Sequence, residues 1–284
     1  MSENQITRSY ATLPVSTQDA NLSWQIHYRE AGSGAPVVLL HPSPLSSEFM
    51  EPLLDRFSKH SRSIAWDTPG YGQSDALTQP KPGLKPYASA LHQFMQHMEL
   101  EKPILYGSAT GAQIAIEYSL AFPEAVRGLI LENVAWFYEE ERDAIMASYF
   151  PSLKPKTDGS HLQIAWQMSD QLYRYFPWYH KSERSRISDE GAPLEVVHQT
   201  ALHYLISGEN YDTAYRAAFL NEKPEPIQAL RVPTRILLWS GSLLDKYSNR
   251  LNQVKLPDNV TLHRAGKSSK ERFLILENTL RELL

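Results

Sequence analysis

The sequence contains no cysteine. Its absence excludes disulfide bonds, zinc sites built on thiolates and a cysteine nucleophile. The chain also lacks any run of 18 apolar residues, so it predicts no membrane-spanning helix. Its ten histidines are dispersed and never form the H-x-x-x-H spacing that presents two ligands on one helix face. We therefore expect no metal site and no metal-dependent hydrolase.

A strong excess of charge of either sign is missing as well. The formal net charge is −4, and the densest basic group, residues 267–272, is too short for a binding arm. Nucleic acid and anionic membranes are therefore not expected partners. The N-terminal residues 1–5 are polar and lack the apolar segment of a signal peptide, so a cytoplasmic location is expected. No cofactor is expected, and the sequence does not predict an oligomeric state.

What is present is the composition of an ordinary globular protein, with 42% hydrophobic and 21% charged residues. A length of 284 residues suits one large α/β domain with an insertion. Short apolar runs alternate with helical patterns in the first half of the chain, which is typical of βαβ units and a mostly parallel sheet. The strands are expected at residues 23–28, 36–40, 63–66, 104–106 and 128–131.

The pattern changes in the middle of the chain. Residues 135–222 are rich in aromatic residues and helix-like, without buried strands. Apolar runs typical of strands occur again at residues 234–239 and 259–262, and a final helix is expected at 270–284. We therefore predict a core of residues 1–134 and 223–284, and a helical cap of residues 135–222 over the carboxyl edge of the sheet.

The most informative motif is Gly107-Ser108-Ala109-Thr110-Gly111. It follows an apolar run and opens a helix of small residues, which is the strand, sharp turn and helix of a nucleophile elbow, written G-x-S-x-G in serine hydrolases. The two glycines have the required separation. The middle residue carries only a methyl group, which cannot attack a carbonyl.

Two further motifs complete a resemblance to the α/β-hydrolase superfamily. His41-Pro42-Ser43-Pro44 is similar to its oxyanion loop, and residues 67–75 are similar to its D-x-P-G-x-G-x-S turn. Haloalkane dehalogenases, epoxide hydrolases and C–C bond hydrolases, which carry caps, look most similar. The resemblance implies an α/β-hydrolase fold, with a mostly parallel eight-stranded sheet, helices on both faces and a helical cap insertion.

The resemblance also implies a catalytic triad, and this chain departs from it. Ala109 stands at the position of the nucleophile. The acid, which follows strand six or seven in the family, is best placed at Asp245, and Lys267 stands where an A-G-H triplet would carry the histidine. His263 is interpreted as a residue of the last strand. Two changed positions favour natural divergence over a single engineered inactivation.

The chemistry that remains rests on backbone donors and one cation. Family analogy places the oxyanion hole at the N–H groups of Ser43 and Thr110, which do not depend on the lost nucleophile. Ser108 and Thr110 are expected to point into flanking structure and not to replace it. We expect Asp245 and Lys267 within about 4 Å of each other, near Ala109. Either Lys267 helps to bind an anion, or the pair only fills the space of the triad.

A cap of this kind usually covers a ligand pocket. The residues expected to contact the ligand are His41, His161, Trp166 and Trp178. Two function classes stay open. In the first, the protein acts on a small carbonyl- or carboxylate-bearing molecule by a mechanism without serine. In the second, it is an inactive pseudo-hydrolase that binds a small molecule or a protein partner.

Overall fold

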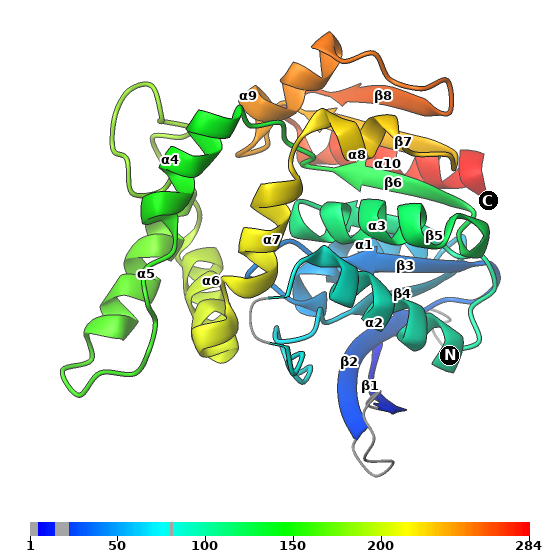
Figure 1. The fold of residues 1–284 in the computed structure, drawn as a ribbon, viewed down its shortest axis with the longest axis horizontal. Helices are drawn as coiled ribbons and strands as arrows, with labels where there is room; N and C mark the ends of the chain where they lie inside the picture. The colour runs from blue at the N-terminus through cyan, green and yellow to red at the C-terminus, as the bar shows by residue number, and fades with distance from the viewer. Residues whose placement is uncertain (1–4, 15–22, 80–81) are drawn as a thin grey trace.

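The computed structural model describes residues 5–14, 23–79 and 82–284. Its centre is an eight-stranded sheet with the strand order β1-β2-β4-β3-β5-β6-β7-β8 (Figure 1). β2 pairs antiparallel with β1 and β4, and all the later neighbours pair in parallel. The strands are β1 (Thr7–Pro14), β2 (Ser23–Ala31), β3 (Pro36–Leu40), β4 (Arg62–Trp66), β5 (Ile104–Ser108), β6 (Gly128–Glu132), β7 (Thr234–Trp239) and β8 (Val260–Ala265).

Helices cover both faces of this sheet. Each continuous apolar strand sends alternate side chains to opposite faces. In β3, Val38 and Leu40 pack in one cluster and Val37 and Leu39 in the other. The first cluster receives α2 (Leu84–His97), α3 (Thr110–Ala121) and α8 (Pro224–Gln228), and the second receives α1 (Glu51–Phe57) and α10 (Ser269–Leu283).

A third apolar cluster belongs to the chain between β6 and β7. This segment contains α4 (Glu139–Tyr149), α5 (Ser160–Leu172), α6 (Leu194–Ser207) and α7 (Thr213–Asn221). Buried aromatic residues of this segment, such as Phe137 before α4, Tyr149 of α4 and Phe219 of α7, form most of the cluster. Figure 1 shows α4, α5 and α6 grouped on the side toward which the parallel strands point. The division into a core and a cap at residues 135 and 222 stays a prediction.

Short elements complete the chain. They are η1 (Ser47–Met50), η2 (Pro123–Ala125), η3 (Gly208–Asn210), α9 (Asp245–Ser248) and η4 (Asn249–Gln253). The predicted α/β-hydrolase fold with eight mostly parallel strands is confirmed, and so is the place of His263 inside β8. β1 was not anticipated by any apolar run, because only Ala11 and Leu13 of its eight residues are buried. No helix among the described residues is long and apolar enough to cross a membrane.

Candidate functional site

Strand β5 and helix α3 meet in a sharp turn at Ala109. Its φ of 47° and ψ of −112° form a backbone conformation that is unfavourable for a residue with a Cβ. Hydrogen bonds hold it: the N–H of Ala109 donates to the carbonyl of Glu132, and the N–H of Gln113 donates to the carbonyl of Ala109, both at 3.0 Å. The strand, turn and helix of the predicted elbow are therefore present around a methyl side chain.

The two glycines of the elbow are required by close packing of α3. A Cβ on Gly107 would lie 2.5 Å from the carbonyl oxygen of Gly111. A Cβ on Gly111 would lie 2.1 Å from the carbonyl oxygen of Leu40 on β3. Neither distance is possible for a side chain. The close approach fixes the start of α3 beside the ends of β3 and β5.

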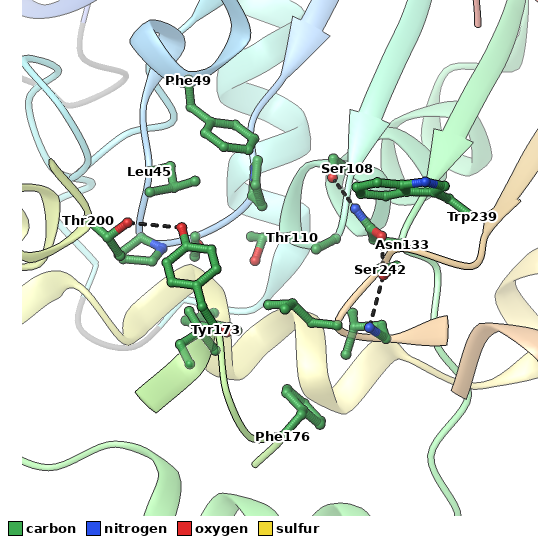
Figure 2. Close-up of a pocket in the computed structure, with 18 of the residues that line it drawn as sticks. Leu45, Phe49, Ser108, Thr110, Asn133, Tyr173, Phe176, Thr200, Trp239 and Ser242 are labelled. Atoms are coloured by element: carbon green, nitrogen blue, oxygen red, sulfur yellow. Dashed lines mark hydrogen bonds between the residues drawn. The ribbon is translucent and has the colours of Figure 1, made fainter. Parts of the chain in front are cut away.

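A cavity of about 320 Å³ lies beside this turn, at the small end of the range for ligand pockets. The loop after β3, the elbow, the segment after β7 and helices between β6 and β7 all contribute to its wall (Figure 2). Most of the wall is apolar. Its principal residues are Pro42, Ser43, Leu45, Phe49, Ser108, Ala109, Thr110, Asn133, Leu172, Tyr173, Phe176, Thr200, Tyr215, Phe219, Glu222, Trp239, Ser242, Leu244 and Arg272.

Three buried polar groups in this wall have no partner among the described residues. They are the hydroxyls of Ser43 and Thr110 and the indole N–H of Trp239. Such groups are uncommon in native proteins. Thr110 is also the first residue of α3, so its backbone N–H has no partner within the helix and lies at the positive end of the helix dipole. Ser43 and Thr110 line the cavity as expected, and their role as an oxyanion hole stays a prediction.

The hydroxyl groups at the elbow are not activated as nucleophiles. The Oγ of Ser108 accepts a hydrogen bond from Asn133 at 2.8 Å, and Asn133 in turn accepts from the hydroxyl of Ser242 at 2.5 Å (Figure 2). Thr110 faces the cavity, whereas we expected its side chain to point into flanking structure. Within the described part of the chain, no base hydrogen-bonds to either hydroxyl, and both lack the activation that a nucleophilic serine or threonine requires.

The expected pair of Asp245 and Lys267 does not form. Asp245 begins the short helix α9, and its carboxylate accepts a hydrogen bond from Asn249 at 2.7 Å. Lys267 is exposed in the turn between β8 and α10, and no ion pair joins it to any residue that the structure describes. Neither residue lines the cavity. The carboxylate of Asp245 instead contacts Asn249, four residues further along the chain, and Lys267 precedes α10 on the surface.

A different ion pair lies at the cavity. Arg272, in the first turns of α10, donates from Nε and Nη2 to the two carboxylate oxygens of Glu132, at 2.6 Å each. Glu132 ends β6 and its side chain is fully buried. The hydroxyl of Tyr106 donates to the same carboxylate at 2.7 Å, and the guanidinium lies over the ring of Trp239. The family's alternative position for the acid, after strand six, is thus occupied by Glu132.

Glu222 is the second acidic residue at the cavity. It directly follows α7, is 5% exposed and lines the wall. Neither oxygen of its carboxyl group bonds to another described residue. Burial raises the pKa of Glu222 to about 8, because the charged form loses its hydration. At neutral pH this carboxyl is therefore largely protonated.

His41 directly precedes the cavity-lining loop residues Pro42 and Ser43 but does not line the cavity itself. Its Nε2 accepts a hydrogen bond from the N–H of Thr68 at 2.9 Å, and its Nδ1 lies 3.0 Å from the carbonyl of Pro42. These partners fix the neutral tautomer with hydrogen on Nδ1. Burial lowers the pKa of His41 to about 4. Both nitrogens hold the loops and the ring does not line the cavity, so its expected contact with a ligand stays a prediction that this geometry does not favour.

The other three expected contact residues also lie outside the cavity wall. His161, in the first turn of α5, accepts from the N–H of Lys156 at 3.1 Å. Trp166 is 43% exposed on the same helix. The indole N–H of Trp178 donates to the carbonyl of Tyr149 at 2.9 Å, so Trp178 is part of the aromatic cluster. Composition indicated an aromatic cap, but it did not reveal which rings face inward.

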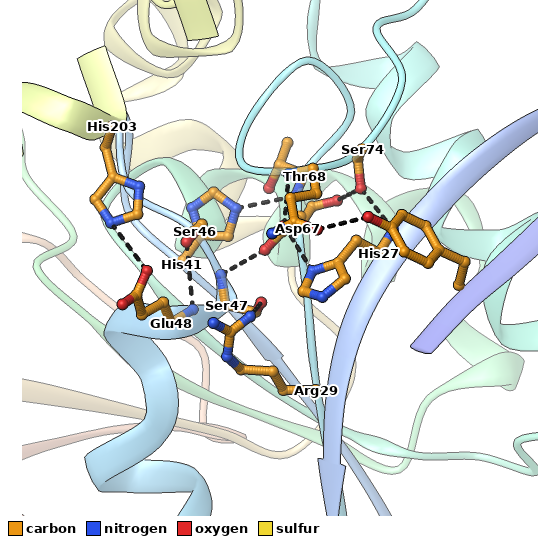
Figure 3. Close-up of polar contacts among 12 residues, drawn as sticks. His27, Arg29, His41, Ser46, Ser47, Glu48, Asp67, Thr68, Ser74 and His203 are labelled. Carbon is orange, nitrogen blue, oxygen red and sulfur yellow. Dashed lines mark hydrogen bonds and ion pairs between the residues drawn. The ribbon is translucent and has the colours of Figure 1, made fainter. Parts of the chain in front are cut away.

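Asp67 organises the loops behind the cavity (Figure 3). Its carboxylate accepts from the backbone N–H groups of Ser47 and Gln73 at 2.6 and 2.9 Å and lies 2.9 Å from His27 Nδ1. Burial alone would raise the pKa of Asp67. The hydrogen bond with His27, nearby His41 and the backbone donors outweigh burial and lower the pKa to about 2. Asp67 therefore remains charged and ties the loops after β3 and β4 together.

Among the residues that were not identified from the sequence are Glu222, Trp239 and Arg272 in the cavity wall, and Glu132, which pairs with Arg272. Glu132 carried a signal, because a charged residue directly after the apolar run 129–131 stands at the carboxyl end of a buried strand. Trp239 likewise ends a strand. Glu222 and Arg272 carried none, since Glu222 directly follows α7, Arg272 lies on α10, and both reach the site only through packing.

Comparison with known proteins gives consistent matches. A family model described as alpha/beta hydrolase fold matches residues 35–273. The chain is 29% identical over 192 residues to (E)-2-((N-methylformamido)methylene)succinate hydrolase of Acinetobacter baylyi, covering 67% of this chain and 65% of that protein. It is 26% identical over 123 residues to haloalkane dehalogenase 2 of Mycobacterium tuberculosis, covering 43% of each. The matched segments therefore span less than two thirds of these relatives.

Solved structures agree on the architecture. An esterase from Thermogutta terrifontis superimposes with a TM-score of 0.68 at 16% identity, covering 96% of this chain and 97% of that one. The haloalkane dehalogenase DatA from Agrobacterium tumefaciens superimposes with a TM-score of 0.65 at 20% identity, covering 98% and 97%. At this level of identity the likeness shows the fold.

Proposed function

The chain belongs to the alpha/beta hydrolase fold family, and from this premise we propose that it acts on a small, neutral carbonyl compound without forming a covalent intermediate on the elbow. The observation that carries the proposal is the apolar cavity beside Ala109, with three polar groups in its wall that lack a protein partner. A carbonyl oxygen accepts from such groups, and an apolar body fits the aromatic wall.

Charge favours a neutral ligand over a carboxylate. The cation expected at the site, Lys267, is exposed elsewhere. Arg272 lines the cavity, but Glu132 engages both sides of its guanidinium fork. Glu222 adds a carboxyl that would repel an anion whenever it is ionised. A carboxylate would therefore lose its hydration at this site without gaining a free counterion.

The reaction classes open to this site are those that need no attacking side chain. Ala109 offers no nucleophile, and the elbow hydroxyls lack a base. Proton transfer, addition and elimination next to a carbonyl remain, because donors near the elbow can stabilise negative charge on the oxygen. The second candidate is an inactive pseudo-hydrolase that binds the same compound, and turnover experiments separate the two.

A matched pair of probes tests the binding proposal. Phenylacetone and phenylacetate have the same number of heavy atoms and differ in that an anionic oxygen replaces a methyl group. Ligand-observed NMR should detect binding of the ketone and little binding of the anion. Thr110→Val should weaken ketone binding by roughly fivefold, the equivalent of about 1 kcal/mol for one hydrogen bond.

The control for this variant is Thr279→Val. Thr279 is equally buried, lies on α10 and bonds only to the carbonyl of Ile275. Its replacement should leave ketone binding unchanged. Preferential binding of phenylacetate, or equal losses in the two threonine variants, would contradict the proposal. Intact-mass measurement after incubation with the ketone should show no covalent adduct.

A further inference from the structure

Glu222 is placed at the cavity by a fixed segment of backbone. It follows the last residue of α7, and its carbonyl accepts from the N–H of Phe137 at 3.2 Å. Phe137 lies shortly after β6, so the hydrogen bond joins the two ends of the helical segment between β6 and β7. The side chain is 5% exposed, and what exposure it has is within the cavity wall. Its position is therefore built into the fold.

The surroundings of the carboxyl are apolar and lack a counterion. Two tyrosines lie nearby, Tyr149 of α4 and Tyr215 of α7, and their hydroxyls bond to each other at 3.0 Å. The cation on the cavity wall, Arg272 of α10, is engaged by Glu132. No described residue compensates Glu222 with a hydrogen bond or an ion pair. No interaction with the protein therefore compensates the free-energy cost of burying this carboxyl, and uncompensated titratable groups of this kind are concentrated at functional sites.

We propose that Glu222 is the proton-transfer group of this cavity, and that the ligand class is a small ketone with a C–H bond next to its carbonyl. This inference rests on the proposed binding of a neutral carbonyl compound at the elbow. It adds a reaction, keto–enol isomerisation, and a residue that contacts the substrate.

The step balances without any co-reactant. The ionised carboxylate takes the proton from the carbon next to the carbonyl: the C–H bond breaks and an O–H bond forms on Glu222. The electron pair of the C–H bond forms the C=C bond, and the carbonyl π pair moves onto the oxygen. The same carboxyl then returns the proton to that oxygen or to a carbon of the conjugated system, which regenerates the carboxylate.

Polar groups elsewhere in the cavity wall suit this charge movement. The backbone N–H and hydroxyl of Thr110 and the hydroxyl of Ser43 lie where the elbow meets the loop after β3. Donors of this kind stabilise an enolate oxygen more than a neutral carbonyl. Because burial raises the pKa of Glu222 to about 8, the carboxyl is a stronger base than an exposed glutamate and still ionises near neutral pH.

Deuterium exchange in the CH₂ group of phenylacetone tests the proposal. The probe is incubated with the full chain in D₂O, and NMR follows the loss of the CH₂ signal. We expect exchange well above the buffer rate, rising with pH through an apparent pKa near 8. Glu222→Gln should lower the protein-catalysed rate by roughly a hundredfold, with the dissociation constant for phenylacetone changed by less than about threefold.

Glu225→Gln is the matched control, since Glu225 is exposed three residues further along the chain and its variant should behave as wild type. A second measurement needs no ligand. In protein labelled with ¹³C at the glutamate carboxyl carbon, one resonance should titrate near pH 8 and be missing from Glu222→Gln.

The outcomes separate the two proposals. Binding of the ketone with no catalysed exchange, or with unchanged exchange in Glu222→Gln, overturns the role of Glu222 and leaves the binding proposal standing. Absence of a carboxyl resonance that titrates near pH 8 also overturns it. Failure of phenylacetone to bind the wild type at millimolar concentration overturns the proposed function and, with it, this reaction.

Discussion

Arg272 and Glu132 form a two-pronged ion pair beneath the elbow, with both N–O distances at 2.6 Å. The two residues are 140 positions apart in the chain, on α10 and β6. The hydroxyl of Tyr106 completes the set of donors to the carboxylate. The pair neutralises Arg272, a cation in the cavity wall. Glu132 is an acid at the carboxyl end of β6, and no histidine bonds to its carboxylate among the described residues.

Removing one member of this pair should be strongly destabilising. Arg272→Met leaves Glu132 buried and unpaired, and the free energy of unfolding should fall by about 3–5 kcal/mol. Combining it with Glu132→Gln should recover part of the loss. Urea unfolding at pH 7 measures both. Arg264→Met, at an exposed arginine on β8, should change stability by less than about 0.5 kcal/mol. Equal losses in the single and double variants would show that charge is not the cause.

Replacing the elbow residue by glycine should stabilise the fold. Ala109→Gly relieves a strained backbone conformation that is worth about 1–3 kcal/mol, against an entropic cost of about 0.5–1 kcal/mol. We expect a net gain of about 1 kcal/mol in urea unfolding. Ala112→Gly, one turn into α3, has no strain to relieve and should lose stability. A loss in both variants would mean that the turn at Ala109 is not strained.

Restoring a hydroxyl at the elbow should not restore ester hydrolysis. In Ala109→Ser the hydroxyl has no base beside it, since Arg272 is paired with Glu132 and Lys267 is exposed. We expect p-nitrophenyl acetate hydrolysis at the rate of the wild type and no stoichiometric labelling by a fluorophosphonate. Labelling of Ser at this position within minutes would reveal a base that the structure does not place there.

The stability of the protein should depend on pH through Glu222. Folding raises the pKa of Glu222 from 4.5 to about 8. Below pH 4.5 the carboxyl is protonated in both the folded and the unfolded state, so it does not reduce the free energy of unfolding. As the pH rises through 8, ionisation favours the unfolded state and this stability is lost. Glu222→Gln has no ionisable group at this position, so its free energy of unfolding does not fall for this reason. At about 1.4 kcal/mol per pKa unit, the variant should exceed wild type by about 4 kcal/mol at pH 8 and match it near pH 4.5 in urea unfolding.

Glu225→Gln again provides the comparison, and its unfolding curve should follow wild type at both pH values. If Glu222→Gln gains nothing at pH 8, the carboxyl is ionised at little cost and is not held in an apolar environment. The gain, if found, measures the stability that the chain gives up by keeping an acid at the cavity.

In the Glu222→Gln variant, which lacks the opposing titration of Glu222, acid should destabilise the protein in two steps. The folded state lowers the pKa of His41 from 6.5 to about 4, so its contribution is complete above pH 6.5 and is lost as the pH falls to 4. Asp67, with its pKa lowered from 3.8 to about 2, adds a loss below pH 4. The steps should be worth about 3 and 2 kcal/mol. Urea unfolding of that variant from pH 7 to 2.5 measures them, and adding His41→Asn should remove only the first.

Features of the fold and the site could be predicted from the sequence where a few neighbouring residues determine them. The parallel strands are continuous apolar runs, and the elbow is a five-residue pattern, so both could be predicted. β1 was missed because only two of its residues are buried. Ala109, Ser43 and Thr110 line the cavity, because they belong to short motifs that follow β3 and β5, and their roles stay predictions.

The rest of the site depends on packing over long distances in the chain. Lys267 was expected at the cavity from its place in a triplet, but the turn before α10 leaves it exposed, and Arg272 enters from the helix instead. Glu222 is brought to the wall by α7, which packs through Tyr215 and Phe219 against aromatic residues from distant parts of the chain. The partners of His41 are likewise set by the meeting of two loops.

The contact of Gly107 with Gly111, and of Gly111 with Leu40, has an evolutionary consequence. Mutation of either glycine would push α3 off the sheet, so selection for a folded chain retains both even when no reaction depends on them. The residue between them is free of that constraint, because its side chain faces the cavity. Substitution there can abolish one chemistry without disturbing the architecture, which leaves the same scaffold open to another.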